Sequence, residues 1–193
     1  MPRPKLHSDE AVLEGARKVL KERGPEAFTL NDVATAVGIS RAALIQRFTN
    51  RQTLLRHIMA HSVELTRSHL NDMPVDVGPQ ALWRFLIDLV GVMGSGDDFA
   101  SNVLLAWYES QDTELRRLAV ERHDLTIAAI AARAPLDGAT APNDVAQMIH
   151  SAIGGASMQW LLRRTGALDA FILAQLHPLM GLLFPGIHFQ QPD

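Results

Sequence analysis

The chain has no cysteine and no long apolar run, and both absences narrow what it can be. Without cysteine among its 193 residues there is no disulfide scaffold, no thiolate nucleophile and no Cys-ligated metal or cluster. The most apolar run, from Phe85 to Met93, is interrupted by Asp88 and is far shorter than the ~20 residues that span a bilayer. Residues 1–5 lack the apolar core of a signal peptide, so we expect a cytoplasmic protein. The apolar content of 47% is enough for a sizeable core.

An overall excess of positive charge is also lacking, since the net charge is −3. The average conceals an asymmetry along the chain. Residues 1–67 carry 11 Lys and Arg against 7 Asp and Glu, whereas residues 68–193 carry 7 against 14. A basic head joined to an acidic body fits a protein whose head meets phosphates, although ordinary surface variation can produce the same imbalance.

Motifs of the common enzyme classes are missing as well. There is no Walker sequence and no Gly-x-Ser-x-Gly, and the three glycines between positions 91 and 96 have the wrong spacing for a dinucleotide fingerprint. We therefore expect no enzyme activity and no cofactor. His57 and His61 lie one helical turn apart with Glu64 nearby, and such a pair can bind zinc. Because the sequence is not His-Glu-x-x-His, an ordinary exposed helix face is the preferred interpretation, and we expect no metal.

What the chain does have is a helix-turn-helix pattern between residues 28 and 48. Thr29 can cap a first helix, and Asp32, three residues on, can bond back to the backbone N–H of the cap. Gly38 stands where that helix must end in a left-handed residue. Ser40 can cap a second helix that starts at the next residue, so stop and restart are about three residues apart. This device places its second helix in the major groove of DNA.

The same stretch resembles the DNA-binding end of the TetR family of transcriptional regulators. The family pattern has three parts: A-x-x-x-L/F-x-x-x-G, T-x-x-x-V/I-A-x-x-x-G-V/I-S and L-Y-x-x-F-x-x-K-x-x-L-L. Two positions depart from it, with Ile45 in place of the usual Tyr and Arg51 in place of the usual Lys. The resemblance covers about the first 60 residues. The matching positions are Ala16, Leu20, Gly24, Thr29, Val33, Ala34, Gly38, Ile39, Ser40, Leu44, Phe48, Leu54 and Leu55.

The resemblance implies which residues meet DNA. The side of the second helix away from the core would face the base edges, where Gln46 can pair with adenine and Ile45 can touch a thymine methyl group. Arg51 keeps the positive charge of the usual Lys and is expected to hold a phosphate. The predicted DNA-binding residues are Thr29, Ser40, Arg41, Ala42, Ala43, Ile45, Gln46, Arg47 and Arg51, and Arg3 and Lys5 are predicted to reach the neighbouring minor groove.

No stretch alternates convincingly with a period of two residues, so we predict an all-α protein. It would have a three-helix, helix-turn-helix DNA-binding domain over residues 1–50 and a larger helical ligand-binding and dimerisation domain over residues 51–193. A helix over residues 51–70 would connect the two. Pro178 is expected to kink or interrupt the last helix. Beyond the helix-turn-helix, helices are expected over residues 9–23, 51–70, 80–93, 98–108, 113–133, 143–164 and 169–184.

The last two helical segments are unusually apolar and could pair with those of a second copy as a four-helix bundle. The resemblance points to that homodimer, with packing inside one chain as the alternative. The predicted interface residues are Ile149, Ala152, Ala156, Trp160, Leu176, Leu179 and Leu183. A ligand pocket is implied likewise, with ordinary core packing as the alternative for each residue. Its candidates are Trp83, Phe85, Met93, Phe99, Trp107, Tyr108, Met158 and Gln159, with His123 as a polar handle.

These features predict a homodimeric, TetR-like repressor whose two heads bind a palindromic operator. The recognition helices would have to lie about 34–36 Å apart to enter successive major grooves. A small-molecule effector would favour another separation and so release the DNA. Two alternatives stay open: an all-α small-molecule-binding protein that keeps the head as a structural domain, and an architectural DNA binder without a ligand.

Overall fold

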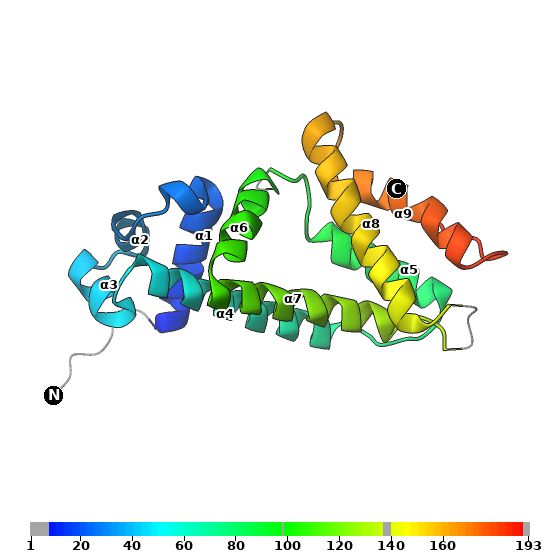
Figure 1. Cartoon of the computed structure of the whole chain (residues 1–193), viewed down its shortest axis with the longest axis horizontal. Helices are drawn as coiled ribbons and strands as arrows, with labels where there is room; N and C mark the ends of the chain where they lie inside the picture. The colour runs from blue at the N-terminus through cyan, green and yellow to red at the C-terminus, as the bar shows by residue number, and fades with distance from the viewer. Residues whose placement is uncertain (1–7, 98, 137–139, 191–193) are drawn as a thin grey trace. The chain divides into compact units, whose positions relative to one another are not determined.

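The structure is a computed structural model that describes residues 8–97, 99–136 and 140–190 (Figure 1). Within these ranges its regular structure is helical only, which confirms the all-α prediction. Every predicted helix forms, and the ends lie within a few residues of the expected ones. The helices are α1 (Asp9–Ala27), α2 (Leu30–Val37), α3 (Arg41–Phe48), α4 (Arg51–Asp72), α5 (Pro79–Gly91), α6 (Phe99–Gln111), α7 (Thr113–Ala131), α8 (Pro142–Arg163) and α9 (Leu168–Leu183).

Two helices contain residues that were expected to end or break them. The regular helix of α1 ends at Gly24 as expected, since its φ of 75° and ψ of 166° are not helical, and a short helical segment follows this kink as far as Ala27. Pro25 directly follows the kink, where a missing N–H leaves no helical bond unmade. Pro178 does not interrupt α9, because the buried Leu176 and Met180 on either side of it hold the helix against the core.

The chain divides into two compact units. Unit 1 comprises residues 1–67 and 100–122, and unit 2 comprises residues 68–99 and 123–193. The compact units do not follow the predicted division at residue 50, because most of α4, nearly all of α6 and the first half of α7 group with the helix-turn-helix. The division by function into a DNA-binding and a ligand-binding domain stays a prediction.

Unit 1 is built on an apolar stripe along α1. Val12, Ala16, Val19 and Leu20 of α1 are all buried. They pack with the buried Val33, Leu44 and Phe48 of α2 and α3, so the expected three-helix core forms. Gly15 lets α1 and α2 approach closely, because a Cβ there would lie 2.8 Å from Cγ2 of Val37.

Unit 2 has a large apolar core formed by α5, α8 and α9, with the end of α7. Gly96, with φ +85°, is needed in the loop before α6, because a Cβ there would lie 2.7 Å from both Trp160 and Leu168. Four residues predicted for the dimer interface, namely Ile149, Ala156, Trp160 and Leu176, belong to this core. That part of the interface prediction is corrected, since side chains buried within one chain are not available to a second copy.

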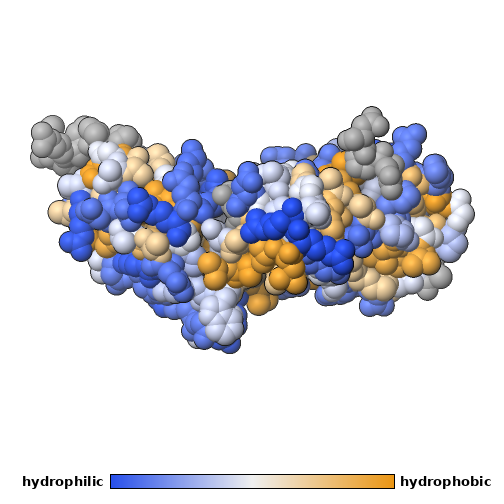
Figure 2. Space-filling model, turned by 90° about the horizontal axis from the view of Figure 1, so that it is seen from above, coloured by the Kyte–Doolittle hydropathy of each residue, from blue (hydrophilic) through white to orange (hydrophobic). Residues whose placement is uncertain are grey.

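The sequence of α8 and α9 does not show which side chains face the core, because both faces of each helix carry apolar residues. The space-filling view shows apolar residues at the surface among charged ones (Figure 2). None of the helices in the described ranges combines the length and the apolar character that crossing a membrane requires.

Candidate nucleic-acid interface

The first helix of the motif begins at a side-chain cap, as predicted. Oγ1 of Thr29 accepts from the backbone N–H of Asp32 at 3.2 Å, and the hydroxyl donates to Oδ2 of Asp32 at 2.6 Å. The expected bond from Asp32 ran to the backbone N–H of the cap; here the carboxylate accepts from the hydroxyl instead. Asp32 also forms an ion pair with Arg23 at 3.2 Å. An exposed threonine therefore stands at the positive end of α2, where free N–H groups favour an anion.

The turn of the motif has the predicted geometry. Gly38 is left-handed, with φ 71° and ψ 32°, and the backbone N–H of Ile39 donates to the carbonyl of Ala34 at 3.0 Å. Ser40 then caps α3 by accepting from the N–H of Ala43 at 3.1 Å. These bonds fix where the recognition helix begins.

One side of α3 is exposed and the other is core, as predicted. Leu44 and Phe48 are buried, and Ile45 is 37% exposed. Arg47 differs from the expectation of an open DNA contact, because its side chain is only 15% exposed and lies 3.5 Å from Oδ1 of Asp9. The face of α3 that is open to a nucleic acid is Arg41, Ala42, Ile45 and Gln46, with Ala43 half-buried at its edge.

A groove of about 560 Å³ collects the start of α2 and two arginines. It is lined by Thr29, Leu30, Asn31, Arg41 and Arg51. The groove therefore combines the free backbone N–H groups of a helix N-terminus with cationic side chains from α3 and α4. An anion of phosphate size fits the chemistry of this lining.

Arg51, which was predicted to hold a phosphate, is bonded to protein groups on three sides. Its Nε donates to the carbonyl of Phe28 at 2.8 Å, its Nη1 to the hydroxyl of Tyr108 at 3.0 Å, and its Nη2 to the carbonyl of Pro25. The guanidinium also lies over the rings of Phe28 and Tyr108, with centroid distances of 5.8 and 5.5 Å. Tyr108, which was predicted for the ligand pocket, is thus a partner of the DNA-binding head.

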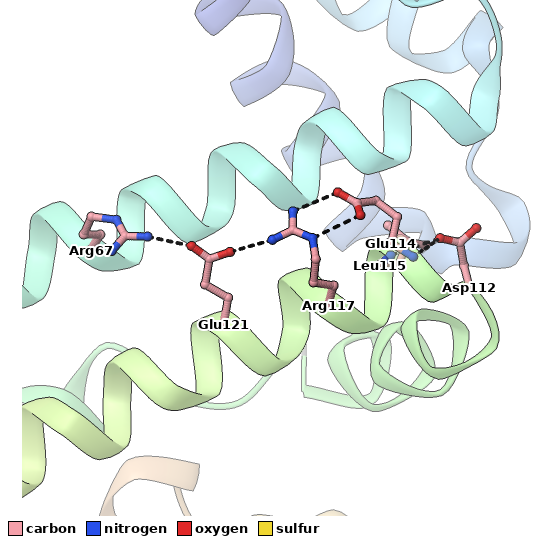
Figure 3. Close-up of polar contacts among 6 residues, drawn as sticks. All are labelled: Arg67, Asp112, Glu114, Leu115, Arg117 and Glu121. Atoms are coloured by element: carbon pink, nitrogen blue, oxygen red, sulfur yellow. Dashed lines mark hydrogen bonds and ion pairs between the residues drawn. The ribbon is translucent and has the colours of Figure 1, made fainter.

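Asp112, which was not among the predicted residues, joins the corner between α6 and α7 to α4. Its Oδ2 accepts from Gln52 at 3.1 Å and from Arg56 at 2.7 Å. Its Oδ1 caps α7 by accepting from the N–H groups of Glu114 and Leu115, both at 3.0 Å (Figure 3). The hydrogen bond from Arg56 is the main reason that the pKa of Asp112 falls to about 2. The Asp-Thr-Glu sequence at this helix start is the signal that could have identified the cap.

A buried carboxylate lies between α6 and α7. Glu109 is 2% exposed, and both its oxygens accept from Nη2 of Arg122, at 3.1 and 3.2 Å. Burial raises the pKa of Glu109 from its ordinary value, and the neighbouring Arg122 opposes that shift. This pair was also missed, because a single Glu in an amphipathic helix gives no sign of burial.

The predicted ligand residues do not gather in one cavity. Trp107 and Tyr108 belong to unit 1, where Trp107 is 70% exposed, and the other candidates belong to unit 2. Trp83 donates its indole N–H to the carbonyl of Gln190 at 2.7 Å, and Phe99 packs against Trp160 with ring centroids 6.2 Å apart. Most of these aromatic residues therefore serve the packing of their own unit.

His123 and Phe85 have distinct surroundings in unit 2. The ring of His123 lies 4.2 Å from that of His150, and burial is the main reason that the pKa of His150 is lowered. Phe85 borders a surface depression of about 250 Å³ between the end of α4 and α5. Met93, Met158 and Gln159 do not line that depression, whose walls are Met73, Pro74, Asp76, Ala81, Arg84, Phe85 and Asp88.

The remaining predictions concern metal binding and the two helices at the end of the chain. His57 packs against Phe48 with ring centroids 5.5 Å apart, and among the described residues no group of three or more His, Cys, Asp or Glu is placed to hold a metal ion. Ala152, Leu179 and Leu183 are half-buried beside the core. The exposed large apolar side chains of α8 and α9 are Met148, Met158, Leu162 and Leu182. Arg3 and Lys5 lie outside the described residues.

Comparison with known proteins finds a family match for the helix-turn-helix region and a shared fold for the rest of the chain. Residues 12–58 match the sequence model described as bacterial regulatory proteins, tetR family. No curated protein matches the chain. Among solved structures, a TetR transcriptional regulator from Legionella pneumophila aligns over 94% of this chain and 100% of its own, with a TM-score of 0.70 and 16% identity.

Two further structures share the fold. The regulator FadR from Bacillus subtilis, in complex with stearoyl-CoA, aligns over 94% of this chain and 100% of its own, with a TM-score of 0.66 and 16% identity. NalD, the secondary repressor of the MexAB-OprM multidrug efflux pump in Pseudomonas aeruginosa, aligns over 92% and 95%, with a TM-score of 0.57 and 20% identity. Residues 12–58 therefore match the DNA-binding region of the TetR family in sequence, and the chain shares the fold of solved TetR-family structures along nearly its whole length.

Proposed function

We propose that this protein is a homodimeric transcriptional repressor that binds a palindromic operator and is released from it by a small molecule. The observation that carries the proposal is the capped helix-turn-helix, whose α3 presents an exposed face beside a cationic groove. A regulator of transcription in a bacterium meets its operator in the cytoplasm, which is where we place it.

The exposed residues of α3 divide into two roles. Gln46 can read an adenine edge, and Ile45 can contact a thymine methyl group. Arg41 and Thr29 line the groove at the start of α2 and would hold a backbone phosphate there. Ser40 fixes the first turn of α3 through its cap and can offer its hydroxyl to the DNA backbone.

The outward faces of α8 and α9 support the dimer. Met148, Met158, Leu162 and Leu182 are exposed apolar side chains on these two helices, and Gly154 and Gly155 have open space where a Cβ would stand. Apolar side chains beside small residues allow another helix to approach closely. A twofold pair would present two α3 helices to the two halves of a palindrome.

The effector is proposed on two grounds. FadR carries stearoyl-CoA in its structure, and NalD is named as a repressor. In this chain a depression of about 250 Å³ lies beside Phe85, and its rim combines the apolar Met73 and Phe85 with the charged Asp76, Arg84 and Asp88. If operator and effector bind opposing states of the dimer, each must weaken the other by the same factor.

The test begins with a duplex of about 30 base pairs that the protein selects from a random pool. Binding measured at several KCl concentrations should weaken by about 0.9 log units per log unit of salt for each phosphate neutralised. Arg41→Ala should weaken binding to all duplexes and reduce that slope. Gln46→Ala should relax the preference at one base position and leave the slope unchanged.

Two outcomes would favour the other candidate functions. Failure of the wild-type protein to bind any duplex at low salt would leave an all-α small-molecule-binding protein with a structural head. Operator binding that no small molecule alters, in a screen read out by release of the selected duplex, would favour an architectural DNA binder.

A further inference from the structure

We infer that Arg51 and Tyr108 act together to position the phosphate groove, and that Arg51 does not itself hold a phosphate. The inference rests on the proposed DNA-binding function and adds a positioning pair to it. Arg51 is the first residue of α4, and Tyr108 lies in α6. Both belong to unit 1, as do all the groups that they contact.

The two carbonyls that Arg51 binds lie just before the start of α2. Its Nε donates to Phe28 at 2.8 Å and its Nη2 donates to Pro25, in the last turns of α1. Phe28 is the residue before Thr29, which caps α2 and lines the groove. The guanidinium therefore holds the segment from which the free N–H groups of α2 extend, and so sets where those groups point.

Tyr108 holds the guanidinium in place. Its hydroxyl accepts from Nη1 at 3.0 Å, so all three nitrogens of Arg51 have protein acceptors. The rings of Tyr108 and Phe28 both lie within 6 Å of the guanidinium carbon, and the ring of Phe28 is buried. An aromatic ring attracts a cation over its face, which adds to the hydrogen bonds.

This arrangement requires an arginine and gives a physical reason for the departure from the usual Lys. A guanidinium presents donors on three nitrogens in a rigid fork and can bind three acceptors at once. An ammonium group is a single point of charge at the end of a flexible stem, so it cannot reach Pro25, Phe28 and Tyr108 together. Lys suits a phosphate contact well, which is why exchange of the two residues separates the two roles.

Tyr108 is itself fixed by the corner that follows it. Asp112, four residues on, accepts from Gln52 at 3.1 Å and from Arg56 at 2.7 Å, both in the first two turns of α4. The end of α6 is therefore bonded to α4 through Tyr108, and the residue that follows α6 is bonded to α4 through Asp112. A displacement of α6 would act on Arg51 and, through it, on the groove at α2.

The experiment uses the full chain and the duplex selected by the wild-type protein. Tyr108→Phe removes one hydroxyl oxygen, and Arg51→Lys keeps the charge while removing the fork. Tyr108→Phe should weaken duplex binding by roughly 3- to 10-fold, the range expected for one lost hydrogen bond, and Arg51→Lys should weaken it by at least as much. The salt slope should stay that of the wild type, because no phosphate contact is lost. The double variant should bind the duplex no more weakly than whichever single variant binds it less tightly, because both changes disrupt the same contact between Arg51 and Tyr108.

A matched control lies next to Tyr108 on the same helix. Trp107→Phe alters an exposed ring that is not part of the pair and should leave binding unchanged. Thermal unfolding of every variant, followed by far-UV circular dichroism, shows that folded protein is compared. If Arg51→Lys does not fold, Tyr108→Phe decides alone, because it removes one atom and leaves the ring.

The inference fails if Tyr108→Phe binds like the wild type, or if the two single effects simply add. It also fails if Arg51→Ala lowers the salt slope by about 0.9 while Tyr108→Phe has no effect, because Arg51 would then hold a phosphate. These results differ from failure of the proposed function, in which the wild-type protein itself binds no duplex.

Discussion

The interactions that stabilise unit 1 differ in kind from those that stabilise unit 2. In unit 1, polar pairs join one helix to another: Arg51 to Tyr108, Arg56 to Asp112, and Arg67 to Glu121 at 2.7 Å. In unit 2 an apolar cluster spans α5, α8 and α9. Hydrogen bonds and ion pairs are directional but contribute little net free energy, whereas apolar burial contributes much and is not directional. Unit 1 therefore adds directional polar contacts between helices to its own apolar core, whereas unit 2 relies mainly on its apolar cluster.

One residue of unit 2 repeats the device of unit 1. Arg133 is buried, and its guanidinium lies 4.0 Å over the ring of Phe85. It donates to the carbonyls of Met73, Pro74 and Ala129 at 2.8–3.0 Å. Desolvation is the main reason that the pKa of Arg133 is lowered. Like Arg51, Arg133 donates to backbone carbonyls while an aromatic ring lies against its guanidinium. Both arginines therefore fix the position of a backbone segment.

The largest expected effect comes from opening the core of unit 2. Trp160 packs against Phe99 and donates its indole N–H to the carbonyl of Gly166 at 3.0 Å. Trp160→Ala should lower the free energy of unfolding by about 3–5 kcal/mol through the cavity and the lost contacts. Urea denaturation followed by far-UV circular dichroism measures it. The same change at the exposed Trp107 of unit 1 should stay within about 0.5 kcal/mol. Equal losses would contradict the contrast between buried and exposed aromatic residues.

A smaller loss is expected from filling a space that unit 2 leaves for a glycine. Gly96→Ala would put a Cβ 2.7 Å from Trp160 and Leu168 at a φ of +85°. Overpacking of this kind costs about 1–3 kcal/mol, measured by the same denaturation. Gly91→Ala is the matched control, because nothing lies within 4 Å of a Cβ there. It should be neutral or slightly stabilising. If both changes destabilise alike, the close approach at Gly96 is not what matters.

The sequence predicts the parts of unit 1 whose structure is local. The caps at Thr29 and Ser40 and the left-handed Gly38 each depend on neighbours within a few residues, and all three form as expected. The helix-turn-helix can therefore be located from the order of its amino acids. The Gly24-Pro25 pair is equally local, since the non-helical φ and ψ of Gly24 end the regular part of α1 where the sequence predicts.

The contacts that complete the site could not be predicted, because their partners are far apart in the chain. Arg51 and Tyr108 are separated by 57 residues, and Arg56 and Asp112 by 56. Nothing in the local pattern distinguishes Tyr108 from a pocket residue or Arg51 from a phosphate ligand. Trp160 and Leu176 illustrate the same limit in unit 2, since a helix that is apolar on two faces does not reveal which one is buried.

A pH-dependent effect is expected from the polar corner of unit 1. The pKa of Asp112 in the folded protein is about 2, below its ordinary value of 3.8, so folding favours the carboxylate. Its contribution to stability is therefore complete above about pH 4 and is lost as the pH falls towards 2. Asp112→Asn should lower the thermal midpoint at pH 6, and the difference from the wild type should shrink as the pH approaches 2. Asp88→Asn, an exposed change in α5, is the control and should give no such trend. A difference that stays constant with pH would show that the charge of Asp112 is not involved.

The smallest effect is expected from the exposed charges along α7. Arg117 bonds to Glu114 at 2.8 Å and to Glu121 at 3.0 Å, and Glu121 also binds Arg67 of α4 (Figure 3). Exposed pairs of this kind contribute little, because water and salt screen them. Arg117→Gln should lower the thermal midpoint by less than Asp112→Asn does, and the difference should vanish in 1 M NaCl, where the screening length is about 3 Å. A loss that persists in 1 M NaCl would mean that Arg117 supports the helix pair through its packed stem, and unit 1 would then depend on apolar contact more than its polar bonds indicate.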